Sequence, residues 1–154
     1  MIRSVAEFVN LRSSEDPADQ TRATLEDADD KVWLAVIEQH PDLRKWVARN
    51  KTVSLSIIRL LTDDPDPLTR TWVARKRKLD RAMFVALSTD ADERVRHALA
   101  TNAKLPPDLL RLLSRDPVAL VATEAQQRLD QRAAAKVKTE VSSEKPVCVE
   151  APLQ

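Results

Sequence analysis

The chain contains no glycine, no tyrosine and only two phenylalanines among its 154 residues. Hairpin turns rely on glycine and strands favour aromatic residues, so this shortage argues against β structure. It also excludes a glycine-rich loop of the kind that cradles phosphates. With 43% hydrophobic and 32% charged residues, the composition fits a folded chain with a heavily solvated surface. These absences predict an all-α fold.

Cysteine is nearly absent as well, because Cys148 is the only one. A single thiol cannot form an internal disulfide or assemble a cysteine-based metal site. The N-terminus has too short an apolar run for a signal peptide, and no later stretch approaches the roughly 20 apolar residues that span a bilayer. We therefore expect a cytoplasmic protein with no membrane segment.

An internal repeat organises the chain. Residues 90–116, DADERVRHALATNAKLPPDLLRLLSRD, contain one unit, and steps of 26 residues toward the N-terminus match residues of the same kind, as in Leu99, Val73 and Val47. A period in this range without a strand pattern is typical of stacked helical repeats. We predict an α-solenoid of about five units over residues 2–135, the first of them degenerate. Residues 136–154 are polar and aperiodic, which predicts a disordered C-terminal tail.

Each unit is predicted to contain two short helices, and such short helices must pack against their neighbours to be stable. Ser54 and Asp80 are predicted N-caps. Residues 31–39, KVWLAVIEQ, suggest a helix buried on several sides. Apolar residues on one face of each helix form the predicted core. In the first helices these are Ile57, Ile58, Leu61, Met83, Phe84, Leu87, Leu109, Leu110 and Leu113, and in the second helices Val47, Val73, Leu99, Leu120, Val121 and Ala125.

The run LSTDADERVRHALATNAKLPPDLLRLLSRD resembles the variant leucine-rich repeat, a bacterial relative of the HEAT repeats. The resemblance rests on the acidic turn residue, the Val-Arg pair, the Ala-Asn end of the second helix, and the proline and paired leucines that follow. It covers about residues 30–128, and residues 2–29 weakly. It implies helical pairs stacked into a right-handed, HEAT-like solenoid. Some members carry an N-terminal cysteine cluster for an iron–sulfur centre, but this N-terminal region has no cysteine, so we expect no cofactor.

An acidic residue precedes an arginine by six positions in successive units. The pairs are Asp16 and Arg22, Glu38 and Arg44, Asp64 and Arg70, and Asp90 and Arg96. An acid at a helix start is favoured by the helix dipole, and an arginine fork can bridge carboxylates or turn carbonyls. Similar residues in HEAT-like proteins form a ladder between adjacent repeats, so the resemblance implies a structural role. Ligand binding by these arginines is the alternative.

Basic residues gather where the second helices end. They are Arg49 and Lys51, then Arg75, Lys76, Arg77 and Lys78, then Lys104. Residues 41–111 carry 15 basic and 9 acidic side chains (net +6), whereas residues 1–40 carry 4 and 9 (net −5). This basic edge is either a solvated surface or a site for a phosphate backbone or an acidic protein. Trp46 and Trp72 occupy equivalent positions, which fits either partly buried packing or stacking on a ligand.

No constellation of residues predicts a catalytic mechanism, and His40 and His97 do not occupy equivalent positions. Our leading hypothesis is a non-catalytic scaffold that binds a protein partner through the concave surface of its second helices. The candidate contact residues are Lys45, Trp46, Arg49, Trp72, Arg75, Lys76, Arg77, Lys78 and His97. Binding of nucleic acid through the basic edge is the alternative. A remote third hypothesis, a HEAT-like DNA glycosylase, lacks a matching motif.

Overall fold

The computed structural model describes residues 1–143, which form ten α-helices and one short 3-10 helix. An isolated bridge between Ile2 and Ala28 is the only β-type pairing in this part of the chain. The all-α prediction is confirmed. The elements are α1 (Val5–Ser13), α2 (Pro17–Leu25), α3 (Asp30–Gln39), η1 (Pro41–Leu43), α4 (Arg44–Arg49), α5 (Leu55–Thr62), α6 (Pro67–Ala74), α7 (Arg81–Ser88), α8 (Glu93–Ala100), α9 (Pro107–Leu113) and α10 (Ala119–Ser143).

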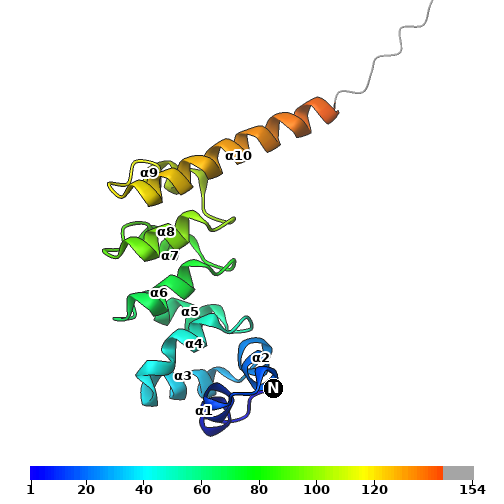
Figure 1. Ribbon diagram of the computed structural model, residues 1–154, viewed down its shortest axis with the longest axis vertical. Coiled ribbons are helices and arrows are strands. Elements are labelled where there is room, and N and C mark those ends of the chain that lie inside the picture. Colours follow the sequence, from blue (N-terminus) through cyan, green and yellow to red (C-terminus); the bar gives the residue numbers. More distant parts are fainter. Residues whose placement is uncertain (144–154) are drawn as a thin grey trace, which may run out of the picture.

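From α3 onward the helices alternate between two layers. The A layer contains α3, α5, α7 and α9, each in contact with the next, and the B layer contains α4, α6, α8 and α10 in the same way. Each B helix also contacts the A helix that precedes it. Figure 1 shows the result as an elongated stack, with α1 and α2 at one end and α10 extending away from the other. Residues that are one 26-residue period apart therefore lie next to one another on the surface of the B layer.

Most helices begin at a side chain that caps the first turn. Ser54 and Asp80 accept hydrogen bonds from the backbone N–H groups of Ile57 and Met83, as predicted. Aspartates cap α2, α3, α6 and α8, and three of the α-helices begin with proline, whose missing N–H costs nothing at that position. These caps explain how helices of eight to ten residues have defined starts.

The core runs along the boundary between the layers. All the core residues predicted in α5, α7 and α9 are buried, and so are Val47, Val73 and Leu99, each fully enclosed. Two expectations were wrong. Helix α3 is not buried on several sides, because Leu34 is 46% exposed, and Leu120 is not a core residue, because it is 64% exposed at the start of α10. Only Val121 and Ala125 of that set face the core.

Helix α10 continues to Ser143, past the end expected near residue 135, so residues 136–143 are helical where a disordered tail was predicted. This segment contains no proline, and its lysine and glutamate residues have good helix propensity. The rest of the expected tail, with Cys148, lies outside the described residues. Within residues 1–143, no helix combines the length and apolar character needed to cross a membrane.

Truncating a core residue should destabilise the protein strongly. Leu99 is fully buried in α8, so we expect Leu99→Ala to lower the free energy of unfolding by about 2–5 kcal/mol. Leu60, 52% exposed on α5, provides the control, and Leu60→Ala should change that energy by less than about 0.5 kcal/mol. Urea denaturation followed by circular dichroism measures both. Equal losses would contradict the placement of the core.

Candidate binding surface

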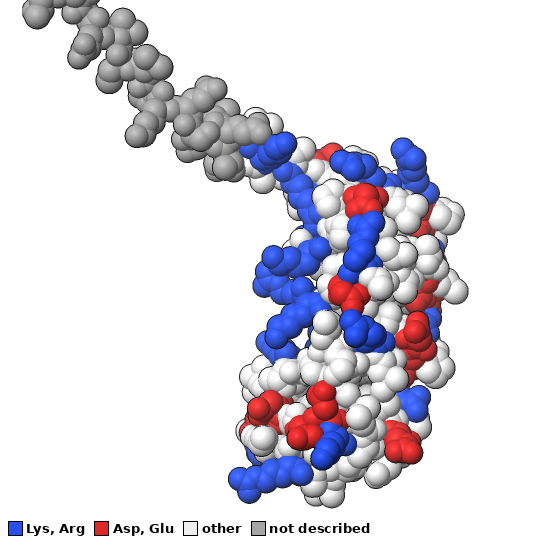
Figure 2. Space-filling view, turned by 180° about the vertical axis from the view of Figure 1, so that it is seen from behind, with Lys and Arg blue, Asp and Glu red and all other residues white. Residues whose placement is uncertain are grey.

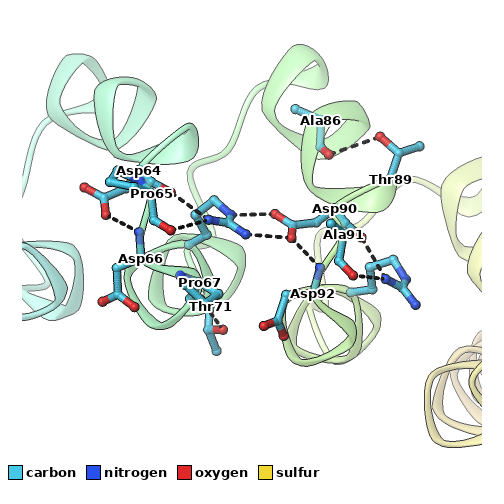
Figure 3. A network of polar contacts seen from close by, with 12 residues as sticks. Asp64, Pro65, Asp66, Pro67, Thr71, Ala86, Thr89, Asp90, Ala91 and Asp92 are labelled. Atoms are coloured by element: carbon cyan, nitrogen blue, oxygen red, sulfur yellow. Dashed lines mark hydrogen bonds and ion pairs between the residues drawn. The ribbon is translucent and has the colours of Figure 1, made fainter.

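Arginines join the turns between the A and B helices of neighbouring units. Arg70 donates from Nε and Nη2 to the two carboxylate oxygens of Asp90, at 2.7 and 3.0 Å. Its Nη1 donates to the carbonyls of Asp64 and Pro65, at 2.7 and 3.2 Å. Figure 3 shows Asp64 and Pro65 on one turn and Asp90 on the next. Arg70 therefore binds the backbone of its own turn and the carboxylate of the following one.

The same arrangement recurs one unit later. Arg96 contacts both carboxylate oxygens of Asp116, at 2.7 and 3.1 Å, and the carbonyl of Asp90 at 2.7 Å. Asp90 and Asp116 each also accept the backbone N–H two residues further on, so one carboxylate orders its own turn and holds the preceding arginine. The Arg96 guanidinium, through this hydrogen bond, lowers the pKa of Asp116 and has its own pKa raised in return. We call these contacts the turn ladder.

The turn ladder weakens toward the N-terminus. Arg44 donates to the carbonyl of Ile37 at 2.8 Å and lies 3.7 Å from the Asp64 carboxylate. Glu38 is exposed and takes part in none of the ion pairs found in the described chain. Arg22 instead contacts Glu7, Asp19 and Glu26. For Arg70 and Arg96, the spacing of six thus relates the arginine to a backbone carbonyl of its own turn, and the carboxylate partner comes from the next unit.

A second ladder lies at the other end of the B helices. Asn50 donates from Nδ2 to the carbonyls of Ala23 and Glu26, at 2.9 and 2.8 Å. Asn102 donates likewise to Ala74 and Lys76, at 2.7 and 2.8 Å. Both asparagines are buried. Sequence reasoning did not single them out as linking residues, although their separation of two periods was a signal that could have done so.

Lys76 occupies the position between these asparagines. Its ammonium donates to the carbonyl of Asn50, and burial, with a smaller effect from Lys78, lowers the pKa of Lys76 to about 8. Arg132 closes the last loop by donating to the carbonyls of Leu105 and Ala103, at 2.8 and 2.9 Å. We call this set, Asn50, Lys76, Asn102 and Arg132, the loop ladder. Lys76 therefore differs from the other cations of the predicted basic edge, because a backbone carbonyl already binds its ammonium.

The remaining cations of the basic edge are exposed. Arg49, Lys51, Arg75, Arg77, Lys78 and Lys104 belong to this set. None of them takes part in the ion pairs found within the described residues. Figure 2 shows Lys and Arg gathered along one edge of the stack. A pocket of about 340 Å³ lies between two loops there, lined by Lys51, Arg75, Lys76, Arg77 and Lys78 with Val53 and Ile58.

Two tryptophans of the B layer stand between arginines. The Trp46 ring centre lies 3.5 Å from the guanidinium carbon of Arg12 and 5.3 Å from that of Arg49. The Trp72 ring centre lies 5.1 Å from Arg49 and 5.0 Å from Arg75. We call these five residues the arginine–tryptophan row. Trp33 lies elsewhere, buried edge-to-face against Phe8 with ring centres 5.2 Å apart.

Arg12 is the member of this row that sequence reasoning missed. It belongs to α1, outside the clear repeats, so no periodic signal connects it to Trp46. Its Nε is buried without a hydrogen-bond partner in the structure, and desolvation, with the nearby charge of Arg49, lowers its pKa. The row therefore concentrates three cations with no acidic neighbour in an ion pair among residues 1–143.

The row ends beside a partly apolar pocket. The pocket, of about 270 Å³, lies between α6, α8 and α10, and Arg75 forms part of its wall. His97 also lines it and is half-buried, whereas Lys45 lies half-buried on α4 and does not line it. The other lining residues are Leu68, Thr71, Glu93, Arg94, Val118, Leu120 and Val121. The structure thus brings Arg75 and His97 together.

The turn ladder should contribute more stability than an exposed ion pair. Arg70→Gln removes a bidentate contact in which the side chains are only 17% and 7% exposed, so we expect unfolding to become easier by about 2 kcal/mol. Arg81→Gln is the control, because Arg81 and Asp108 are 58% and 52% exposed, and it should cost less. Denaturant titration compares them, and a larger loss for Arg81→Gln would refute the assignment.

Lys76 should make stability depend on alkaline pH. Its pKa is about 8 in the folded chain against an ordinary 10.5, so the unfolded chain binds more protons between these values. Stability should therefore rise from about pH 8 to about pH 10.5, by roughly 3 kcal/mol. Lys76→Asn, which introduces the residue found at positions 50 and 102, should remove this rise. An identical pH profile for both proteins would contradict it.

The chemistry of this surface follows from its donors. It offers guanidinium and ammonium groups, and the described residues contain no group of three or more His, Cys, Asp and Glu that could hold a metal ion. Cations without carboxylate partners suit anionic ligands. No protein-family model, curated protein or solved structure matches the chain.

Proposed function

We propose that the chain is a right-handed α-solenoid of about five two-helix repeats, similar to the variant leucine-rich repeat, and that it acts as a non-catalytic module binding a protein partner. The contacts of like helices within each layer and the two ladders support the stacked arrangement. Stacked repeats present extended surfaces to their partners. The B layer is the binding surface, because the arginine–tryptophan row and the partly apolar pocket both lie on it.

The observation that supports this function is that the arginines of the turn ladder have carboxylate partners, whereas those of the arginine–tryptophan row have none among the described ion pairs. Arg44, Arg70 and Arg96 lie in α4, α6 and α8, and each has a carboxylate within 4 Å. Arg12, Arg49 and Arg75 instead share two tryptophans. Aromatic residues and arginines are the side chains that most often dominate protein interfaces. Carboxylates within the protein already neutralise Arg44, Arg70 and Arg96, so a partner would instead supply acceptors for Arg12, Arg49 and Arg75.

The basic edge favours a second candidate, binding of a nucleic-acid backbone. Its pocket is surrounded by cations and has no acidic residue in its lining. Phosphate contacts of this kind give affinity without sequence preference and weaken steeply with salt. Protein binding remains our conclusion, because the row and the apolar pocket offer more than charge alone.

Affinity purification from the native cell tests the proposal. We expect a protein that is retained by the wild-type chain and lost with Arg49→Gln/Arg75→Gln. The matched control is Arg111→Gln/Arg115→Gln, which removes the same charge from exposed residues at the end of the A layer and should retain the partner. Identical recovery with all three proteins would overturn the assignment of the B layer.

A salt series with random duplex DNA tests the second candidate. We expect no binding even at low salt if the surface is for proteins. Tight binding that falls steeply with added salt, and that Arg77→Gln/Lys78→Gln abolishes, would instead favour the nucleic-acid function. Thermal denaturation of each variant verifies that it is folded.

A further inference from the structure

The arginine–tryptophan row holds three guanidinium groups in a fixed order. Arg12 lies in α1, Arg49 is the last residue of α4 and Arg75 directly follows α6. The rings of Trp46 and Trp72 stand between these arginines at 3.5–5.3 Å. A guanidinium stacked on an aromatic ring keeps its in-plane N–H groups available for carboxylates. The row therefore presents oriented donors whose side-chain freedom is already restricted, which lowers the entropic cost of binding.

The stacking also bears on which anion the row fits. Each indole already has two guanidinium groups close to its ring centre. A nucleobase that stacked on Trp46 or Trp72 would compete with these contacts, whereas a carboxylate needs only the edges of the guanidinium groups. Carboxylates can thus bind the row without displacing its ring contacts.

The partly apolar pocket extends the row at its Arg75 end. Leu68 and Leu120 in its lining are 43% and 64% exposed, so an apolar side chain placed there would remove leucine surface from water. Glu93 is also in the lining and would repel a further acid at this position. Along the surface, Arg12, Arg49 and Arg75 therefore follow one another, and the partly apolar pocket comes after Arg75.

We propose that this surface binds an extended acidic segment of a partner protein. Its aspartates or glutamates contact Arg12, Arg49 and Arg75, and one large apolar side chain at one end of the acidic stretch enters the pocket between α6, α8 and α10. This inference rests on the proposed protein-binding function and specifies the chemistry of the partner. The charge complementarity of the row selects the acidic residues, and the pocket determines the direction in which the segment lies.

Fluorescence anisotropy with the full chain tests the inference. The probe is a labelled synthetic peptide with several glutamates followed by one leucine, compared with a peptide in which glutamine replaces glutamate and with another in which serine replaces the leucine. A single-stranded oligonucleotide of equal charge is the third comparison. We expect the acidic peptide with leucine to bind best, and its affinity to fall with added salt.

Variants locate the binding. Arg49→Gln should weaken the acidic peptide about tenfold or more, the effect of one lost charge-assisted hydrogen bond, and Arg111→Gln should leave it unchanged. Arg49→Lys keeps the charge without the planar fork and should still weaken binding. Leu120→Ser should remove the advantage of the leucine over the serine peptide while leaving the requirement for glutamate.

Three results would overturn the inference. These are tighter binding of the oligonucleotide than of the peptide, equal effects of Arg49→Gln and Arg111→Gln, and no peptide binding at all. If the last occurs while a partner recovered from cells still requires Arg49 and Arg75, the proposed protein-binding function stands and the acidic segment is rejected. If no such partner is recovered either, both are rejected.

Discussion

Backbone carbonyl groups that follow each B helix have to be satisfied in a chain without glycine. Helices commonly end with a residue of positive φ, usually glycine, that redirects the last carbonyls, yet none of the described residues has positive φ. The loop ladder solves this problem with side chains from the following unit. Asn50, Lys76, Asn102 and Arg132 each donate to carbonyls one unit earlier. The close approach of neighbouring B helices at this end depends on these contacts.

The turn ladder acts at the opposite end of the same helices and in the opposite direction. Arg70 and Arg96 reach forward to the carboxylates of Asp90 and Asp116, whereas the loop ladder reaches back. With both ends linked, a B helix cannot rotate without breaking contacts on one side. This explains how the row on the B layer can hold large side chains in order although α4 has only six residues.

The fold could be predicted where its physical cause repeats along the chain. The caps at Ser54 and Asp80 and the apolar faces of α5, α7 and α9 recur at one period, so they were visible in the sequence. The position of Leu120 was not, because its unit replaces the usual short helix by the long α10. Comparison with the earlier units correctly predicted that Val121 and Ala125 are buried, but it wrongly placed the side chain of Leu120 in the core.

The candidate surface was predictable only in part. Trp46, Trp72, Arg49 and Arg75 could be named because each pair is one period apart. Arg12 could not, since its contact with Trp46 joins a degenerate first unit to a regular one through the geometry of the chain fold. The run of cations around Lys76 placed it in the predicted basic edge. The burial of its ammonium could not be predicted, because it depends on the preceding loop.

The loop ladder also gives the stack a temporal order. A loop made early in synthesis cannot complete its hydrogen bonds until the unit after it has left the ribosome and folded. Until then, water must hydrate the carbonyls of Ala23 and Glu26, and later those of Ala74 and Lys76. Each newly made unit thus replaces water at the loop carbonyls of the unit before it. In the described chain, α10 does so last, through Arg132.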